Sequence, residues 1–465
     1  MIQKIAFYSF SVGISALEHY RIFNPLKYAA IQVLSGINEQ GVNLSIIQDC
    51  DLVLFQREFS THFDAYKSVI NKARDLGKPV VLDLDDNLLA LPTDHPDRIS
   101  TYYASGLPAF LHALLNVDGV TVTTEPLKKA VQKLNPNVWV LPNYFDDQLW
   151  DFRLPQPNSL DDPVRILYMG TASHRPDLNS ISKPLFQITE SLGEAIEFYF
   201  YGIEPPSGLE ELTKVTYQPV QTFNYEIFAS YMGQIQADIA IAPLCDNMFN
   251  RSKSAIKFFE YTAMGIPGVF ADISPYSTVI NDGYNGLLAR TPEQWYEKVR
   301  LLIDNSNLRQ QIIQNAQKSV KTKWLIKKHA SEWLDAYNRI SQSVREAQVD
   351  RNHILDSLEM VVTQQKEIRD KQELINALND KTSTQLWQLG VLKEEIKEKN
   401  KIIEFNRHAQ EELINKVEDL EHKLVDYQHE IDELERTISK IYLSKSWTIT
   451  RPIRKLLGGS KGGSV

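Results

Sequence analysis

Short, fully apolar segments alternate with helix-like segments along the first third of the chain, and this alternation constrains the fold more than any other feature. Strands are expected at residues 4–9, 44–47, 52–55, 80–84, 119–123 and 138–141, with helices between them such as 66–76 and 125–134. A strand that is apolar along its whole length is buried on both faces, as the strands of parallel sheets are. Residues 1–150 therefore predict an α/β domain with a doubly wound parallel sheet.

A second alternation of the same kind follows a short connecting segment. Residues 151–163 contain three prolines and few apolar side chains, which is typical of an interdomain linker. Beyond it we expect strands at 164–169, 197–202, 237–242 and 268–271, and helices at 183–192, 294–304 and 308–323. Residues 164–340 therefore predict a second domain of the same class. Two such domains bind ligands between them, at the carboxyl ends of their strands.

Residues 345–442 carry a different repeat, in which eleven of thirteen positions spaced seven residues apart are apolar. The series from Ile354 to Ile438 keeps one register, and its second half, from about Val391, is the stronger. A sustained seven-residue repeat predicts a left-handed coiled coil. We expect this segment to pair with other copies of the chain, giving a homo-oligomer, or with a partner coil, and to bend near Gly390 and residues 382–385. The alternative is one long solvated helix.

The last residues, 443–465, form a basic tail. They hold five lysines or arginines and no acidic residue. Together with Trp447, these cations predict peripheral contact with anionic lipid at the inner face of the cell membrane, or with a partner. A frayed tail in solution is the alternative. The run from Ser446 to Arg454 resembles a terminal motif of bacterial surface-polysaccharide enzymes.

Charge and cysteine content exclude several classes of protein. A net charge of −9 argues against nucleic-acid binding. Cys50 and Cys245 lack metal-ligand spacing and fit the reduced thiols of a cytoplasmic protein. The apolar N-terminal run lacks a small-residue cleavage site, so it indicates a first strand rather than a signal peptide. No run reaches the roughly 18 apolar residues that a membrane span needs.

The most distinctive charges lie between residues 251 and 267. Lys257 and Glu260 are three residues apart, which places them on one face of a helix. That helix is expected to begin near Ser252 or Ser254, which are good N-cap residues, and to end at Gly265.

The start of this helix is also rich in cations. Arg251, Lys253 and Lys257 surround its expected N-terminus, where a phosphate or diphosphate binds readily. Glu260, one turn deeper, offers an acceptor for the paired hydroxyls of a sugar.

This segment, Lys257-Phe-Phe-Glu260-Tyr-Thr-Ala-Met-Gly265-Ile-Pro267, is followed by a strand and by the turn Gly283-Tyr-Asn285-Gly286. The pattern resembles the nucleotide-sugar site of the retaining glycosyltransferases of family 4. The resemblance covers about residues 1–340 and implies their GT-B fold of two Rossmann-like domains.

The resemblance also implies a chemistry and residue roles. The co-substrate would be a nucleoside-diphosphate sugar, with no other cofactor and no metal, and the acceptor a glycan, a lipid-linked glycan or a protein. Glu260 would hold the ribose, and Asn285 and Gly286 would shape the pocket near the sugar. Ser252 stands where the family has a glutamate that touches the transferred hexose.

Polar residues also follow the first strand of each domain. Tyr20 and Arg21 resemble the Tyr-Arg pair on the acceptor side of the family's first domain. Gly170, after the expected strand 164–169, would let a phosphate approach the backbone, and Arg175 would pair with it. His174 between them fits a loop hydrogen bond or a catalytic role.

Three acids, Asp83, Asp85 and Asp86, end the expected strand 80–84. They fit a divalent cation site, an acceptor site with catalytic support by Asp85 and Asp86, or loop-capping carboxylates. The resemblance favours the acceptor site, because Asp85 stands where the family usually has an acceptor-facing histidine and the diphosphate signature lies in the other domain. Lys257 is the expected catalytic cation of that signature.

Two further functions stay open from the sequence alone. Ser252 in place of glutamate, and the single Gly13 in the first-domain loop, fit a catalytically weak GT-B scaffold that organises partner enzymes through its coiled coil. A two-domain epimerase acting on nucleotide sugars would convert its donor without any acceptor. We expect a glycosyltransferase, of the retaining type, that acts in bacterial surface polysaccharide or glycoconjugate synthesis.

Overall fold

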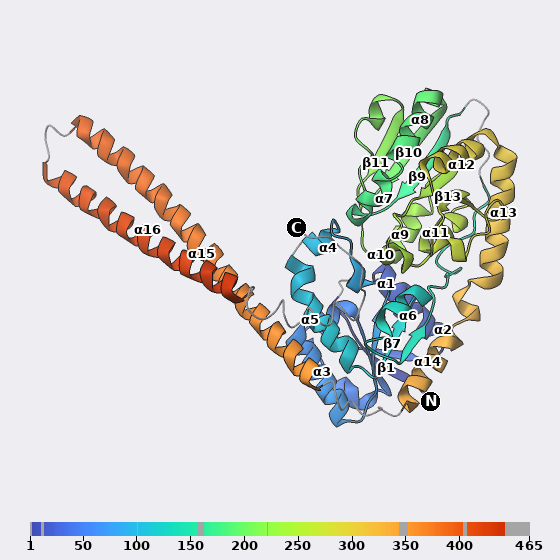
Figure 1. The fold of residues 1–465 in the computed structure, drawn as a ribbon, viewed down its shortest axis with the longest axis horizontal. Helices are drawn as coiled ribbons and strands as arrows, with labels where there is room; N and C mark the ends of the chain where they lie inside the picture. Colours follow the sequence, from blue (N-terminus) through green and yellow to red (C-terminus); the bar gives the residue numbers. More distant parts are fainter. Residues whose placement is uncertain are drawn as a thin grey trace. The chain divides into compact units, whose positions relative to one another are not determined.

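The computed structural model describes residues 2–10, 14–99, 101–155, 162–220, 222–343, 352–402 and 407–441. The chain forms two compact units, Met1–Arg351 and Asn352–Val465. The first is an α/β unit and the second is helical (Figure 1). The predicted basic tail at 443–465 and the middle of the predicted linker, 156–161, lie outside the described residues.

The first domain of the α/β unit contains a six-stranded sheet in which every strand is parallel to its neighbours. The spatial order is β2 (Gln32–Ser35), β1 (Lys4–Tyr8), β5 (Leu52–Gln56), β6 (Val80–Leu84), β7 (Gly119–Val122) and β8 (Val138–Val140). Its helices are α1 (Ala16–Glu18), α2 (Asn24–Tyr28), α3 (Phe63–Asp75), α4 (Pro96–Ile99), α5 (Thr101–Asn116) and α6 (Glu125–Val131), and a small antiparallel pair is formed by β3 (Ile37–Asn38) and β4 (Gly41–Val42).

The prediction of a strand at residues 44–47 is wrong. This segment begins a 3₁₀ helix, Ser45–Asp49, because the side-chain oxygen of Asn43 accepts hydrogen bonds from the backbone and hydroxyl of Ser45 and starts a turn. The missing strand is β2, which the apolar pattern did not reveal because it is an edge strand with half-exposed side chains. The other strands expected in this domain are present.

The second domain repeats the architecture with another six-stranded parallel sheet. The order is β11 (Lys214–Gln218), β10 (Ile196–Tyr201), β9 (Val164–Met169), β12 (Ile239–Ala242), β13 (Gly268–Ala271) and β14 (Leu287–Ala289). Its helices are α7 (Arg175–Asn179), α8 (Ser182–Leu192), α9 (Tyr225–Met232), α10 (Met248–Arg251), α11 (Ile256–Ala263), α12 (Pro292–Asp304) and α13 (Ser306–Lys323). The strand order reverses between β9 and β12, which is where ligands bind in open α/β sheets.

The end of the α/β unit returns to the first domain. Helix α14 (Ser331–Gln342) buries Trp333, Tyr337 and Ile340 in the same apolar cluster as Ile5 and Leu54 of the first sheet. Helix α14 therefore packs on the first domain although it follows the second domain in the chain. The chain thus links the two domains twice, which limits how far they can separate.

Helix α11 ends as predicted but begins differently. Gly265 has a φ of +78°, and the backbone N–H groups of Gly265 and Ile266 donate to Thr262 and Tyr261, which makes a Schellman C-cap. Neither predicted serine caps the start: the N-cap is Ala255, without a side-chain bond. Serine is a good N-cap residue, but the short helix α10 ends at Arg251 and Ser252 is its C-cap. The sequence pattern did not reveal this separate helix.

The helical unit consists of α15 (Asn352–Ile402) and α16 (Arg407–Ile441). The two helices run antiparallel, because Lys381 lies over the ring of Tyr427 while Lys393, further along α15, pairs with the earlier Glu421. An apolar cluster of Ile375, Leu378 and Ile431 fills the space between them.

The predicted bend near Gly390 and residues 382–385 is wrong, since α15 continues through it. Thr382, Ser383 and Thr384 have only modest helix propensity, and the long helix on either side of them overrides it. The seven-residue apolar series contributes Ile375 and Ile431 to contacts within one chain. A coiled coil between copies stays a prediction.

Candidate functional site

An unpaired ammonium group marks the N-terminal turn of α11. The Nζ atom of Lys257 is buried and has no hydrogen-bond partner among the described residues, and it lies 5.3 Å from the centre of the Tyr168 ring. Burial, and then the nearby Lys253, lower the pKa of Lys257 to about 8. A buried cation without a partner is costly, so its presence indicates a ligand that brings negative charge.

Glu260 lies one turn further along α11 and is 5% exposed. One of its carboxylate oxygens accepts a hydrogen bond of 2.8 Å from the hydroxyl of Tyr225, which is itself 2.7 Å from the hydroxyl of Tyr20 in the first domain. Burial raises the pKa of Glu260 to about 7, while Tyr225 and Lys257 oppose the rise. Its other oxygen has no partner among the described residues.

His174 lies in the loop after β9, beside the same lysines. Its Nδ1 is 2.8 Å from a carboxylate oxygen of Asp177, which is 3% exposed. The other oxygen of Asp177 accepts hydrogen bonds from the backbone of Cys245 and the side chain of Asn250. Burial, Lys257 and Lys253 lower the pKa of His174 to about 3, so the imidazole is neutral.

Two acids, Asp85 and Asp86, follow β6, and an arginine follows the neighbouring strand β5. Arg57, directly after β5, lies 3.1 Å from Asp85 and 3.2 Å from Asp86. Burial raises the pKa of Asp85 to about 7 although Arg57 opposes it. Burial would also raise the pKa of Asp86, but Lys253, Arg57 and His174 lower it overall. Asp86 thus interacts with cations from both domains, Arg57 and Lys253.

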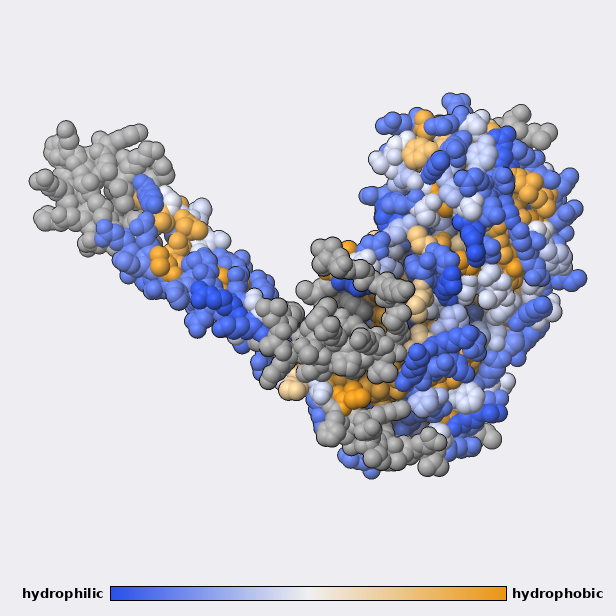
Figure 2. All heavy atoms as spheres, viewed as in Figure 1, coloured by the Kyte–Doolittle hydropathy of each residue, from blue (hydrophilic) through white to orange (hydrophobic). Residues whose placement is uncertain are grey.

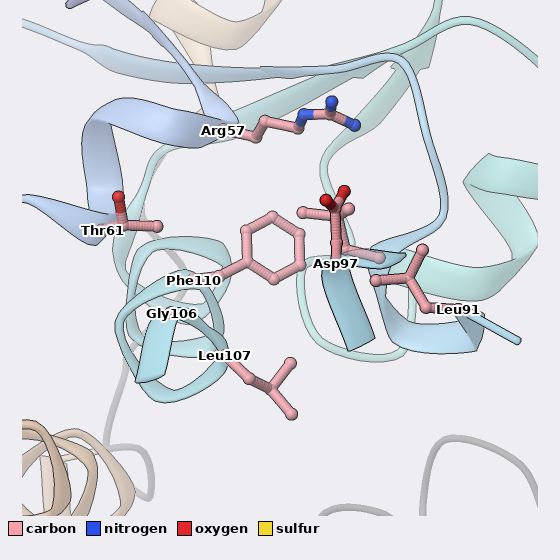
Figure 3. A pocket seen from close by; sticks show the side chains of 8 residues that line it. Arg57, Thr61, Leu91, Asp97, Gly106, Leu107 and Phe110 are labelled. Atoms are coloured by element: carbon pink, nitrogen blue, oxygen red, sulfur yellow. The ribbon is translucent and has the colours of Figure 1, made fainter. Parts of the chain in front are cut away.

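We call these six residues the polar cluster: Arg57, Asp85, Asp86, His174, Lys253 and Lys257. Arg57 also borders an apolar pocket that is lined by Leu107 and Phe110 (Figure 3). This pocket measures about 30 Å³, room for about two water molecules, which is too small for a sugar ring.

Direct hydrogen bonds fasten the two domains beside the cluster. Ser252 accepts a bond of 3.2 Å from Asn87 at its hydroxyl and one of 2.7 Å from Thr124 at its carbonyl. The side chain of Asn143 donates to Ser254 over 2.9 Å. A hollow of about 210 Å³ remains beside these bonds, lined by residues of both domains that include Phe259. Ser252, expected near the donor sugar, is therefore a contact between the domains.

Several predicted site residues have other partners. Arg251 belongs to α10 and pairs with Asp246 at the surface, so it does not join Lys253 and Lys257 at the start of α11 as expected. Arg175 donates to the backbone of Glu204. Arg251 was expected at a phosphate because it is close to Lys257 in the sequence, and Arg175 because it follows Gly170 in the loop after β9, but both side chains extend elsewhere.

On the acceptor side, two corrections are needed. Arg21 is fully buried and donates to both carboxylate oxygens of Asp83, to Leu141 and to Asn143, so it has no surface for an acceptor. Tyr20 is likewise buried and its hydroxyl is bonded to Tyr225. Both residues support the domain structure.

The glycines and Asn285 have local roles. A Cβ atom at Gly170 would lie 2.7 Å from the hydroxyl of Tyr168, so packing alone requires glycine there. The side chain of Asn285 accepts from Asn281 and donates to Val279 within its own loop. Gly286 packs against Ile280 in the same loop. Local packing and hydrogen bonding therefore account for these residues without a ligand.

Sequence reasoning missed Arg57, Asp177 and Tyr225. Arg57 carried one usable signal, since it follows a fully buried strand next to β6 and so had to lie at the same edge as Asp85. The partner of His174 was three residues away, a spacing that suits one helical turn. Nothing in the sequence pointed to Tyr225.

Metal clusters and membrane-spanning helices are both absent from the described residues. No cluster of three or more His, Cys, Asp or Glu side chains is arranged to hold a metal ion in the described part of the chain. Among the described helices, none has the length and hydropathy needed to cross a membrane. Hydrophilic side chains cover most of the visible surface of the α/β unit (Figure 2).

Residues 187–335 match the model of a family described as "Glycosyl transferase-like". This region contains Lys253, Lys257 and Glu260. No curated protein matches the sequence.

Solved structures resemble the α/β unit at low identity. Sucrose-phosphate synthase from Thermosynechococcus elongatus aligns over 73% of this chain and 99% of its own, with 11% identity and a TM-score of 0.53. HepE from Anabaena, in complex with UDP and glucose, aligns over 72% and 100%, with 13% identity and a TM-score of 0.48. TarM aligns over 64% of this chain, with 14% identity and a TM-score of 0.45, and the chain spans 59% of its length. The predicted GT-B fold of two parallel-sheet α/β domains is confirmed.

Proposed function

We propose that the protein transfers a sugar from a nucleoside-diphosphate sugar to an acceptor glycan, lipid-linked glycan or protein. The observation that carries this proposal is the buried Nζ of Lys257 at the N-terminal turn of α11, which has no hydrogen-bond partner in the part of the chain that the structure describes. It lies in the region of the family match, and the structural neighbour HepE was solved in complex with UDP and with UDP-glucose.

Sugar transfer places growing negative charge on the departing diphosphate. Lys257 and Lys253 lie where they would stabilise that charge, and the backbone N–H groups at the start of α11 add to their effect. Because these cations are fixed before the substrate arrives, little reorganisation is needed during the reaction. In this proposal the free oxygen of Glu260 accepts hydrogen bonds from the ribose.

The first domain would supply the acceptor side. Asp85 and Asp86 follow β6, and Asp86 interacts with Lys253 of the second domain, so an acceptor bound at these acids would lie near the proposed diphosphate. The raised pKa of Asp85, about 7, suits a group that exchanges a proton with an acceptor hydroxyl near neutral pH. Retention of configuration is part of the proposal and rests on the family resemblance.

The test is the release of nucleoside diphosphate from a panel of UDP-, GDP- and dTDP-sugars, with and without candidate acceptors. We expect one donor to be turned over, and Lys257→Ala to abolish its turnover and weaken nucleotide binding. Lys318→Ala, which changes an exposed lysine of α13 in the same domain, is the matched control. Unchanged UDP and GDP binding by Lys257→Ala would refute the site.

The engagement of Ser252 between the domains favours one alternative, a nucleotide-binding scaffold without turnover. Its hydroxyl donates to Met248 and accepts from Asn87, so it is not free to contact a sugar. Nucleotide binding that Lys257→Ala removes, together with no turnover of any donor on the panel, would support the scaffold over the enzyme.

A further inference from the structure

His174 has one ring nitrogen held by the protein and one free. Its Nδ1 is bonded to Asp177, while its Nε2 has no partner within the described residues. Asp177 cannot rotate away, because its second oxygen is held by the backbone N–H of Cys245 at 2.7 Å and by the side chain of Asn250 at 2.8 Å. The orientation of the imidazole is therefore fixed before any ligand binds.

This arrangement also determines which nitrogen carries the proton. Burial would raise the pKa of Asp177, but its hydrogen bond with His174 and the charges around it lower the pKa overall, so the carboxylate is ionised. An ionised carboxylate only accepts hydrogen bonds, so Nδ1 must carry the proton and donate it. In a neutral imidazole the opposite nitrogen, Nε2, then presents a lone pair.

The lone pair on Nε2 of His174 can accept a hydrogen bond only from those groups of a nucleotide sugar that are donors. Phosphate oxygens are acceptors and gain nothing from it, whereas a sugar hydroxyl can donate to it. The charges of Lys253 and Lys257 reach His174, so the proposed diphosphate lies close by, and the sugar is covalently attached to that diphosphate.

We propose that Nε2 of His174 accepts a hydrogen bond from a hydroxyl group of the donor sugar, and that Asp177 is the positioning residue that maintains this tautomer. The proposal rests on the proposed function and adds a contact that discriminates between a nucleotide and its sugar conjugate. A site built to accept a hydroxyl disfavours ligands that lack it.

Asp177→Asn tests the tautomer with little change in shape. The new amide oxygen can still accept from Cys245 and Asn250, while the amide nitrogen turns to His174 and donates to Nδ1. The imidazole must then carry its proton on Nε2, which becomes a donor. Labelling the histidines of the full-length protein with ¹⁵N and recording their ring-nitrogen shifts measures this directly. We expect an Nδ1–H tautomer for His174 at neutral pH, and an Nε2–H tautomer in Asp177→Asn.

The binding test compares each nucleotide with its sugar conjugate, using UDP with UDP-glucose and GDP with GDP-mannose in calorimetry. A change in diphosphate binding, including one caused by the charge lost at position 177, alters both affinities equally. It therefore cancels in the ratio of the two affinities. We expect Asp177→Asn to lower the affinity of the conjugate relative to the nucleotide about tenfold, as the loss of a hydrogen bond that leaves a buried group unpaired does.

A second substitution separates tautomer control from simple structural support. In His174→Gln the amide oxygen can accept a hydroxyl, so the ratio should stay within about threefold of the parent protein. His174→Phe has no ring nitrogen that could present a lone pair or a proton, so Asp177→Asn should have no further effect on the ratio in that background. Equal effects in both backgrounds would overturn the positioning role of Asp177.

Three results would overturn the proposal: an Nε2–H tautomer in the unchanged protein, an affinity ratio that Asp177→Asn does not alter, or a loss confined to transfer, which would assign the contact to the acceptor. The nitrogen shifts need no ligand, so they report on His174 even if no nucleotide binds. Failure of the proposed function would appear elsewhere, as unchanged nucleotide binding in Lys257→Ala.

Discussion

Replacing Arg21 by methionine tests whether this side chain supports the first domain rather than an acceptor. Its Nε lies 2.9 and 3.0 Å from the two oxygens of Asp83, and both side chains are almost completely buried. The guanidinium also donates to the carbonyl of Leu141 and the side chain of Asn143, which join the end of β8 to the interdomain connection. Methionine fills similar space without any of these bonds.

The expected loss of folding stability is large because the carboxylate of Asp83 remains buried without its partner. Breaking a buried ion pair by removing one member costs about 3–5 kcal/mol, since an uncompensated charge remains in the interior. Burial already raises the pKa of Asp83 and Arg21 opposes that rise, so the pKa should rise further in the variant. The penalty is then full above the raised pKa and fades as pH falls toward the unfolded value of about 3.9.

Urea unfolding of the full chain, followed by tryptophan fluorescence, measures the loss. Arg300→Met is the matched control, because Arg300 pairs with Asp304 on the solvent side of α12 and such pairs contribute about 0–1 kcal/mol. We expect a lower midpoint for Arg21→Met at neutral pH and a smaller difference near about pH 5. If Arg21→Met unfolded like Arg300→Met but showed weaker acceptor kinetics, the original acceptor assignment would be right.

Three further predictions follow from other parts of the chain. UDP affinity should rise as pH passes about 7, where Glu260 ionises, and fall as it passes about 8, where Lys257 loses its proton; a flat calorimetric profile would contradict both shifts. Gly265→Ala should destabilise the protein by about 1 kcal/mol or more in thermal unfolding, because the positive φ disfavours a side chain; an unchanged midpoint would count against this cap. Ile431→Asp should separate α16 from α15, which proteolysis of the hairpin would detect, whereas unaltered cleavage would indicate that the contact with Ile375 is dispensable.

The sheets could be predicted from sequence because a continuous apolar run is stable only where both of its faces are buried. Strands such as β5 and β9 are buried along most of their length, and their residues show it. Strand β2 lacked that signal, since an edge strand has one unpaired side and half-exposed side chains. The position of Lys257 and Glu260 on α11 followed from helical spacing, which is a local property.

The side-chain partners could not be predicted in the same way. Arg21 and Arg251 are both arginines beside expected sites, yet one is buried against Asp83 and the other pairs at the surface with Asp246. That outcome depends on which residues the tertiary fold brings near each of them. The partner of the apolar face in the helical unit was equally hard to predict. A seven-residue period shows which side of a helix is apolar, but it does not show whether the partner helix runs parallel or antiparallel, or whether it belongs to the same chain.

The hydrogen bonds of Ser252 have a consequence for the order of events in turnover. Ser252 is adjacent to Lys253, and it is bonded to Asn87 and Thr124 of the first domain. Moving the domains apart would break both bonds and displace the turn that carries Lys253, one of the proposed diphosphate contacts. Nucleotide exchange and domain opening would therefore be thermodynamically linked, and by reciprocity a bound nucleotide would strengthen the grip of one domain on the other.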